Sequence, residues 1–171
     1  MAKTKPAKTT VDASWLLSDL DKPAFEPSET CYLTDAMGGS LQNWANRGLL
    51  SPARTREGKG GTRLYTKTDV FTVKISQSLI RFGIVVSSAL DLASTIVKTL
   101  FRAVAAIKDE KERIEVTLNA TAWVYSDVPR RTLEITYTRA KIWAPDVDAM
   151  YVNIGGHLKQ VLDAYNYGRE D

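Results

Sequence analysis

Apolar residues recur at intervals of three and four along three stretches of the chain, and each stretch predicts an amphipathic helix. The first covers residues 40–47, where Gly48 follows as a left-handed stop. The second begins at the N-cap candidates of residues 66–69 and ends at Gly83. The third covers residues 87–108, and its apolar face is broad enough to pack on its own domain and on a further surface. The face expected to be buried in the second helix consists of Phe71, Ile75, Leu79 and Phe82.

The period of the pattern changes from helical to two in the last third of the chain. Residues 114–125 alternate apolar and polar side chains, and residues 132–143 do so again with many β-branched and aromatic residues, which predicts an antiparallel pair of strands. Residues 147–165 fit either a strand followed by a helix or one helix broken by Gly155 and Gly156. We prefer the strand and helix, because paired glycines destabilise the interior of a helix.

Two segments lie outside these periodic stretches. Residues 55–65 have the glycine density of a tight hairpin followed by an extended segment that ends at Tyr65. Residues 1–27 are rich in Lys, Thr, Ala, Pro and Asp, which predicts a flexible tail that cannot offset its own ordering entropy. The apolar patch of residues 15–20 is the exception within this tail, and it is expected to dock on the body of the protein or on a partner.

Composition argues against several kinds of site. The chain has one cysteine, Cys31, and one histidine, His157, so we expect no disulfide, no metal cluster and no cofactor. We expect Cys31 to be a small buried residue and His157 to be a surface or capping residue. The most hydrophobic stretch, residues 83–107, is interrupted by three charged residues, and no secretory pattern follows the basic N-terminus. We therefore expect a cytoplasmic protein without a membrane span.

Positive charge is concentrated in one part of the chain, although the net charge is only +3. Residues 40–81 contain eight Lys and Arg against two acidic residues, a balance of +6. Residues 108–171 contain nine basic and eleven acidic residues, a balance of −2. This distribution is typical of a phosphate-contacting module joined to a part that does not touch nucleic acid.

Four linked motifs follow one another within the basic segment: Leu41 and Trp44, then Gly48-Leu49-Leu50, then Pro52 and Arg54, then Arg63 and Tyr65. In this order they resemble the DNA-binding domain of MerR-family regulators over residues 31–85, about a third of the chain. The resemblance implies a winged helix-turn-helix that binds double-stranded DNA. Gln42 and Asn43 stand where the family usually has Arg and Tyr, which implies different base contacts. The segment before Leu41 is short and rich in glycine, which predicts a truncated first helix.

The residue types on the expected outer side of this helix suit DNA recognition. Amide side chains can make bidentate contacts to adenine, and arginine can contact guanine or phosphate. Cations in the wing suit phosphate neutralisation and insertion into the minor groove. The rings of Trp44 and Tyr65 are expected to lie in the core. The predicted DNA-contact set is Ser40, Gln42, Asn43, Asn46, Arg47, Arg54, Arg56, Lys59, Thr62, Arg63 and Tyr65.

The sequence therefore predicts an α+β fold: a winged helix-turn-helix head, a long helix, and a C-terminal antiparallel β-hairpin or small sheet with a terminal helix. The expected domains are a flexible N-terminal tail (1–27), a MerR-like winged helix-turn-helix (28–86), a linking or dimerisation helix (87–110) and a C-terminal α+β dimerisation or sensor domain (111–171).

The favoured function is a sequence-specific transcriptional regulator that binds double-stranded DNA as a dimer, whose subunits meet along residues 89–107 or through the sheet. The alternative is a phage DNA-packaging protein of the small-terminase type or an excisionase-type accessory protein. A small-molecule or protein effector is a third hypothesis, for which Trp123, Tyr125, Tyr137 and Trp143 would line an apolar pocket. No enzyme is predicted, because the single histidine has no identifiable partner and residues 58–61 lack the rest of a P-loop.

Overall fold

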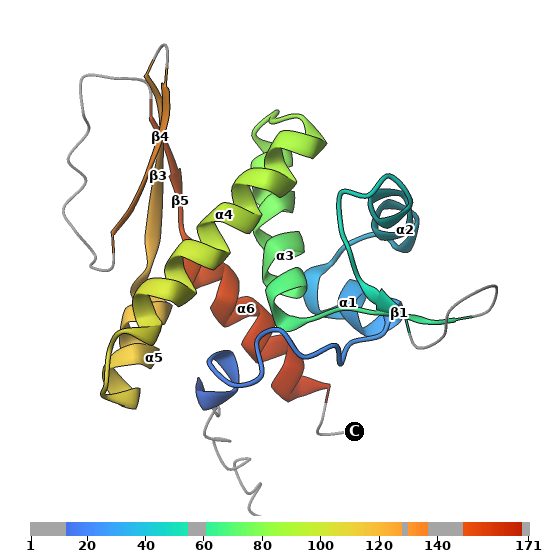
Figure 1. The fold of residues 1–171 in the computed structure, drawn as a ribbon, viewed down its shortest axis with the longest axis horizontal. Coiled ribbons are helices and arrows are strands. Elements are labelled where there is room, and N and C mark those ends of the chain that lie inside the picture. The colour runs from blue at the N-terminus through green and yellow to red at the C-terminus, as the bar shows by residue number, and fades with distance from the viewer. Residues whose placement is uncertain (1–12, 55–60, 128–129, 137–148, 169–171) are drawn as a thin grey trace, which may run out of the picture.

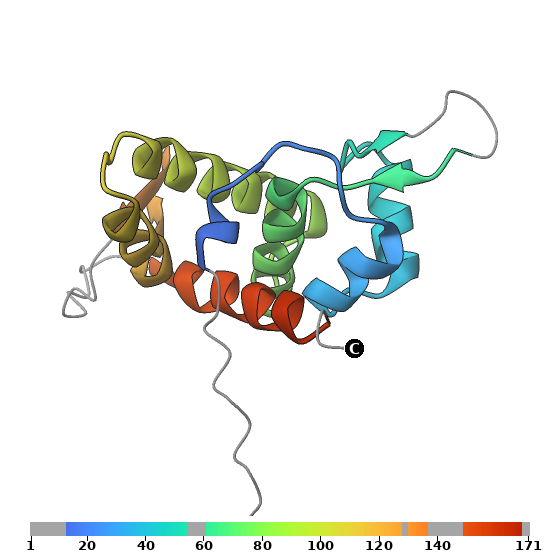
Figure 2. The same cartoon turned by 90° about the horizontal axis from the view of Figure 1, so that it is seen from below.

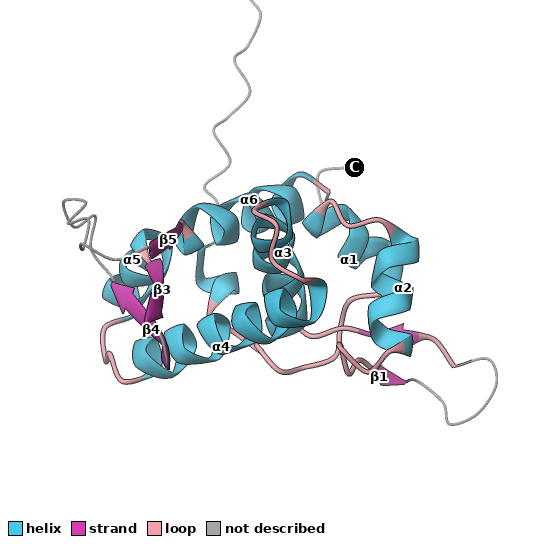
Figure 3. Cartoon of the chain, turned by 90° about the horizontal axis from the view of Figure 1, so that it is seen from above, coloured by secondary structure: helices cyan, strands magenta, loops and turns pink. Residues whose placement is uncertain are grey.

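A computed structural model of the chain describes residues 13–54, 61–127, 130–136 and 149–168. The fold is α+β and mostly helical (Figures 1 and 3). A short 3-10 helix (Ala13–Leu16) is followed by α1 (Pro27–Thr34), α2 (Gly38–Asn46), β1 (Ala53–Arg54), β2 (Arg63–Leu64), α3 (Lys67–Arg81), α4 (Val86–Ala105), α5 (Glu110–Asn119), β3 (Thr121–Asp127), β4 (Arg130–Thr136), β5 (Ala149–Val152) and α6 (Ile154–Tyr167). In Figure 1, α2 and the β1–β2 pair lie at one end and the three-stranded sheet lies at the other.

Local signals set the ends of the first long helices, as predicted. The Thr66 side chain accepts from the backbone of Asp69, whose carboxylate accepts from the Thr66 backbone in return, and this capping box starts α3. Gly48 (φ +71°) and Gly83 (φ +86°) adopt the left-handed conformation just after α2 and α3. The prediction that Phe82 is buried is wrong: α3 ends at Arg81, so the Phe82 side chain lies at the C-cap and is 69% exposed.

The core runs through the whole described chain, so α4 is not a free linking helix. Phe71, on α3, stacks on Phe101, on α4, with ring centroids 5.7 Å apart. The apolar face of α4 is buried within this one chain. Its buried residues are Ala89, Leu90, Ala93, Ile96, Val97, Leu100, Phe101 and Val104. The prediction that a partner subunit packs along residues 89–107 is therefore corrected, because the molecule's own helices already cover this face.

The segment before α1 packs on the core, which corrects the prediction of a flexible tail for residues 13–27. Leu16 is fully buried, and Phe25 is 4% exposed and pairs by backbone hydrogen bonds with Tyr65. Trp15 stacks on Tyr165 of α6, with ring centroids 4.1 Å apart. The expectation that residues 15–20 dock on the body is confirmed. Residues 1–12 lie outside the described part of the chain.

The first C-terminal strand begins later than predicted. Residues 110–119 form α5, in which the Asp109 side chain caps the backbone N–H of Glu112 at 2.7 Å, and β3 starts only at Thr121. The alternating pattern over residues 114–119 misled the prediction, because a short amphipathic helix also places Ile114, Thr117 and Leu118 toward one side. The N-terminal carboxylates of this segment suit a helix start.

The antiparallel pair and the final strand and helix agree with the prediction. β3 pairs antiparallel with β4 and with β5, giving the order β4-β3-β5. Asn153 caps α6, and Gly155 and Gly156 lie inside its first turn rather than before it. In Figure 2, α6 extends along the body from the sheet toward α1. Of the four aromatic residues proposed to line a pocket, Tyr137 and Trp143 lie outside the described residues, while Trp123 packs on Tyr151 at 5.2 Å.

A search of the described helices finds none with the length and apolar character needed to cross a lipid bilayer.

Candidate nucleic-acid interface

Two helices joined by a tight turn form the first part of the site. α1 has eight residues and starts at Pro27, and only residues 35–37 separate it from α2. Asp35 adopts the left-handed conformation (φ 60°) that ends α1 and redirects the chain. The predicted helix before Leu41 is therefore present, as two turns of α-helix.

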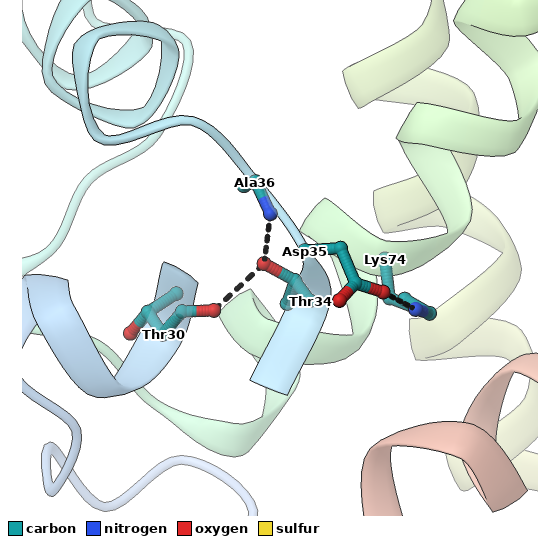
Figure 4. Close-up of polar contacts among 5 residues, drawn as sticks. All are labelled: Thr30, Thr34, Asp35, Ala36 and Lys74. Carbon is teal, nitrogen blue, oxygen red and sulfur yellow. Dashed lines mark hydrogen bonds and ion pairs between the residues drawn. The ribbon is translucent and has the colours of Figure 1, made fainter. Parts of the chain in front are cut away.

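Polar contacts fix this turn against α3 (Figure 4). The Thr34 hydroxyl donates to Thr30 O at 2.7 Å and accepts from the Ala36 N–H at 3.3 Å. Asp35 forms an ion pair with Lys74 of α3 at 2.7 Å. The ion pair adds a surface contact between the turn and α3, while the buried side chains of Leu33, Leu41 and Trp44 anchor α1 and α2 in the core.

One face of α2 holds the helix and the other is open. Leu41 and Trp44 are 1% and 7% exposed, so they anchor α2 as predicted. Ser40 is half-buried. The exposed residues of the predicted contact set on this helix and its cap are Gln42, Asn43, Asn46 and Arg47. This face carries three amides and a guanidinium, which are the groups that can make paired hydrogen bonds to base edges.

A two-stranded antiparallel hairpin lies beside α2 and is connected to it. β1 pairs with β2 in the register Ala53 with Leu64 and Arg54 with Arg63. The Arg63 guanidinium donates from Nη2 to Asn46 Oδ1 at 2.6 Å. Two residues predicted to contact DNA therefore contact each other, 17 positions apart in sequence, and join the hairpin to the end of α2.

The remaining predicted contacts divide into three groups. Thr62 is exposed beside β2, whereas Arg54 is described only through its backbone in β1. Arg56 and Lys59 lie outside the described residues. Tyr65 is removed from the set, because its side chain is 1% exposed and burial raises its pKa above the ordinary value, with Arg63 acting in the opposite direction. Its expected place in the core is confirmed.

Not all of the Lys and Arg side chains of residues 40–81 lie near the hairpin and α2. This corrects the interpretation of the whole basic segment as one phosphate-contacting module. Lys67 is 5% exposed, and its ammonium donates to Trp15 O, Ser18 O and Ser18 Oγ at 2.6, 2.7 and 3.0 Å. Lys74 is engaged by Asp35. Both lysines thus hold other segments on α3, and among the side chains that the structure describes the cations next to α2 and the hairpin are Arg47 and Arg63.

The remaining candidates for chemistry are the possible metal ligands, Cys31 and His157. No group of three His, Cys, Asp or Glu side chains within residues 13–54, 61–127, 130–136 and 149–168 could hold a metal ion. Cys31 is half-buried in α1, and burial raises the pKa of its thiol. His157 is half-buried in the first turn of α6, and burial, Lys74 and Arg81 lower its pKa while Gln160 opposes them. The capping role at this turn belongs to Asn153 and not to His157.

Sequence reasoning missed the contacts that position the site. Asp35 with Lys74 and Lys67 with Trp15 join residues 39 and 52 positions apart, and nothing in the local pattern pairs them. The one feature of the sequence that indicated such a contact was the apolar patch around Trp15. The arrangement as a whole presents hydrogen-bond donors, acceptors and positive charge on a helix and a hairpin at one end of the molecule.

A comparison with protein-family models finds no match to the chain, and a comparison with curated proteins finds no significant match.

Proposed function

We propose that the protein binds double-stranded DNA through α2 and the β1–β2 hairpin, as a sequence-specific transcriptional regulator with a winged helix-turn-helix head that resembles the MerR type. The observation that carries the proposal is the exposed amide and arginine face of α2 (Gln42, Asn43, Asn46 and Arg47), placed next to a hairpin that it contacts through Arg63. The order of the motifs from Leu41 to Tyr65 supports the same conclusion.

In the proposed complex α2 enters the major groove. An α-helix with its side chains is about 10–12 Å across and fits a major groove about 12 Å wide. Gln42, Asn43 and Asn46 are suited to adenine and Arg47 to guanine or phosphate. Arg63 and the other hairpin arginine, Arg54, supply positive charge to the phosphate backbone or the adjacent minor groove. The bond from Arg63 to Asn46 sets the angle between the two elements before DNA arrives, which lowers the ordering cost of binding.

The first test is selection of bound sequences from a random double-stranded pool over a salt series. Asn43→Ala is expected to relax one or two positions of the selected motif, a loss of about 1–3 kcal/mol of discrimination there. Arg63→Ala is expected to weaken binding to all sequences and to reduce the slope of log affinity against log salt by about 1. Gln160→Ala and Arg102→Ala replace exposed residues of α6 and α4 and serve as matched controls. The absence of any enriched motif at low salt would overturn the proposal.

The regulator is proposed to act as a dimer, which would place two α2 helices on half-sites about 34 Å apart. Since the apolar face of α4 is already covered, the subunits are proposed to meet at the end that holds the sheet. Val85 is 71% exposed there, at the α3–α4 corner, and it lines a cavity of about 290 Å³ together with Ile84, Leu92 and Val124 of β3. An exposed apolar surface of this kind is typical of a protein contact.

The mass of the particle in solution tests the dimer separately. Val85→Asp is expected to yield monomers without loss of folding, because Val85 is the N-cap of α4 and Asp is a preferred N-cap residue. Tyr167→Asp, an exposed aromatic at the far end of α6, is the control. Light scattering that reports an unchanged dimer in the Val85 variant would contradict the proposed contact. A ring of many subunits would favour the DNA-packaging alternative.

A further inference from the structure

A cavity of about 450 Å³ lies between the N-terminal segment, α1 and α6. Cavities that hold small molecules span about 300–1,000 Å³, so the space is sufficient for one. We propose that this cavity binds a small aromatic amino acid in its zwitterionic form. The site is separate from the exposed face of α2, and the inference does not depend on DNA binding.

The wall of the cavity is aromatic and firmly held on one side. Trp15 stacks on Tyr165 with an interplanar angle of 24°, and its edge meets Phe25 in a T-shaped contact at 6.1 Å. Tyr32, on α1, lines the same cavity and is 50% exposed. A planar ring bound in the cavity beside Tyr32 would cover apolar surface that now faces solvent. Aromatic pairs of this kind add about 0.5–1.5 kcal/mol to the gain from burial.

A buried positive charge faces the cavity without a direct ionic partner. Lys67 lines it and lies over the Trp15 ring, with Nζ 4.5 Å from the ring centroid. The three hydrogen bonds of its ammonium go to neutral oxygens, and among the described residues no carboxylate forms an ion pair with it. Asp19 acts on Lys67 only at longer range. All three donors of the ammonium are engaged, so a ligand carboxylate that displaced the Ser18 Oγ contact would give Lys67 the counter-ion that it lacks.

Charges of both signs line the cavity, and this selects a zwitterion over a simple anion or cation. Lys22 and Lys67 are matched by Asp19 and Glu29. A ligand with one net charge would meet as much repulsion as attraction, whereas an amino acid can turn its carboxylate toward the lysines and its ammonium toward the acidic side chains. The Ser18 hydroxyl makes the longest of the three contacts to Lys67, 3.0 Å, and can rotate to donate to the carboxylate.

Calorimetric titration of the full chain without DNA tests the ligand class. L-tryptophan is the probe, and three analogues each remove one feature: indole-3-propionate lacks the ammonium, tryptamine lacks the carboxylate and L-leucine lacks the ring. Saturable one-to-one binding of L-tryptophan is expected, with each analogue weaker by about tenfold or more, equivalent to about 1.4 kcal/mol. No saturable binding of L-tryptophan at millimolar concentration overturns the proposal, and so does equal binding of L-leucine.

Two substitutions then locate the site. Lys22→Ala, at an exposed rim position, is expected to weaken L-tryptophan about tenfold but not to weaken tryptamine, because only the former has a carboxylate and the latter loses a like-charge repulsion. Tyr32→Leu keeps the apolar character of a half-exposed position and is expected to weaken both probes. Lys98→Ala, at an exposed position of α4, is the control. Equal loss in the Lys98 variant, or no loss in either site variant, contradicts this location.

Discussion

The two ends of the molecule share one apolar core but differ in the contacts that join their elements outside it. At the end with α1, α2 and the hairpin, Leu41 and Trp44 are buried in the core, and two exposed polar contacts are added: Asp35 to Lys74 and Arg63 to Asn46. At the other end, α5 and α6 meet through backbone packing, and Gly155 N–H donates to Ala120 O at 2.8 Å. Polar contacts on the surface adjust to a partner and to solvent conditions, whereas close packing tolerates no added volume. Salt is therefore expected to weaken the polar contacts at the end proposed to bind DNA and to leave the packing of α5 on α6 unchanged.

The largest expected effect is a loss of stability at the end where α5 packs on α6. Gly155→Ala would place a Cβ into the backbone peptide of Leu118 and Asn119, which cannot rotate away as a side chain could, so we expect a loss of about 3 kcal/mol or more in the free energy of unfolding. Urea denaturation measures it. Gly39→Ala is the matched control, because a Cβ there meets nothing within 4 Å and the helix should gain about 0.5 kcal/mol. Similar stability of the two variants would contradict the close packing proposed at Gly155.

The second effect lies between the two ends, at the N-terminal segment. Lys67→Met keeps the volume but leaves the carbonyls of Trp15 and Ser18 without their donor, which is expected to cost about 2 kcal/mol. Residues 13–25 should then become more sensitive to limited proteolysis than the rest of the chain. Lys98→Met, on the exposed face of α4, should change neither property. Unchanged proteolysis in the Lys67 variant would show that the segment is held by Leu16 and Trp15 alone.

A smaller effect concerns pH. Burial and the neighbouring Lys74 and Arg81 lower the pKa of His157 below its ordinary value of 6.5, so the folded state favours the neutral ring. The unfolded state then binds more protons, and the stabilisation present above pH 6.5 is lost as the pH falls through the folded pKa. Thermal unfolding between pH 7 and pH 5 should show a smaller decrease in Tm for His157→Gln than for the wild type. An identical decrease in both proteins would rule out this role.

The smallest expected effect concerns the ion pair at the end with α1, α2 and the hairpin. Asp35→Asn removes the charge of the ion pair with Lys74 but keeps a residue type that tolerates the left-handed backbone. The Asp35 side chain is 73% exposed, so the expected loss is about 0.5 kcal/mol and should vanish at high salt. Asp91→Asn, exposed on α4, is the control for the change in net charge. A loss that persists at 1 M salt would indicate a hydrogen-bond role for Asp35.

Sequence reasoning succeeded where a few neighbouring residues decide the structure. Gly48, Gly83 and the Thr66 and Asp69 pair mark helix ends through local backbone geometry and local hydrogen bonds. It failed over residues 114–119, where the apolar residues alternate as in a strand but the Asp109 cap starts a helix. For the site, the inward and outward faces of α2 were predicted from Leu41 and Trp44, but Tyr65 was assigned to the contact set although its ring is buried.

The sequence by itself determined the ends of α2 and α3, the antiparallel pairing of β3 with β4 and the polar face of α2, because each depends on residues close together in the chain, whereas the pairing of β3 with β5 depends on the tertiary structure. Only the tertiary structure decided which cations remain available to a partner. Lys67 and Lys74 belong to the same basic run as Arg63, yet they hold residues 52 and 39 positions away. The tertiary structure also decided what covers α4, because its broad apolar face is equally suited to a partner or to the protein's own core. These outcomes depend on how the whole chain packs, which no local pattern encodes.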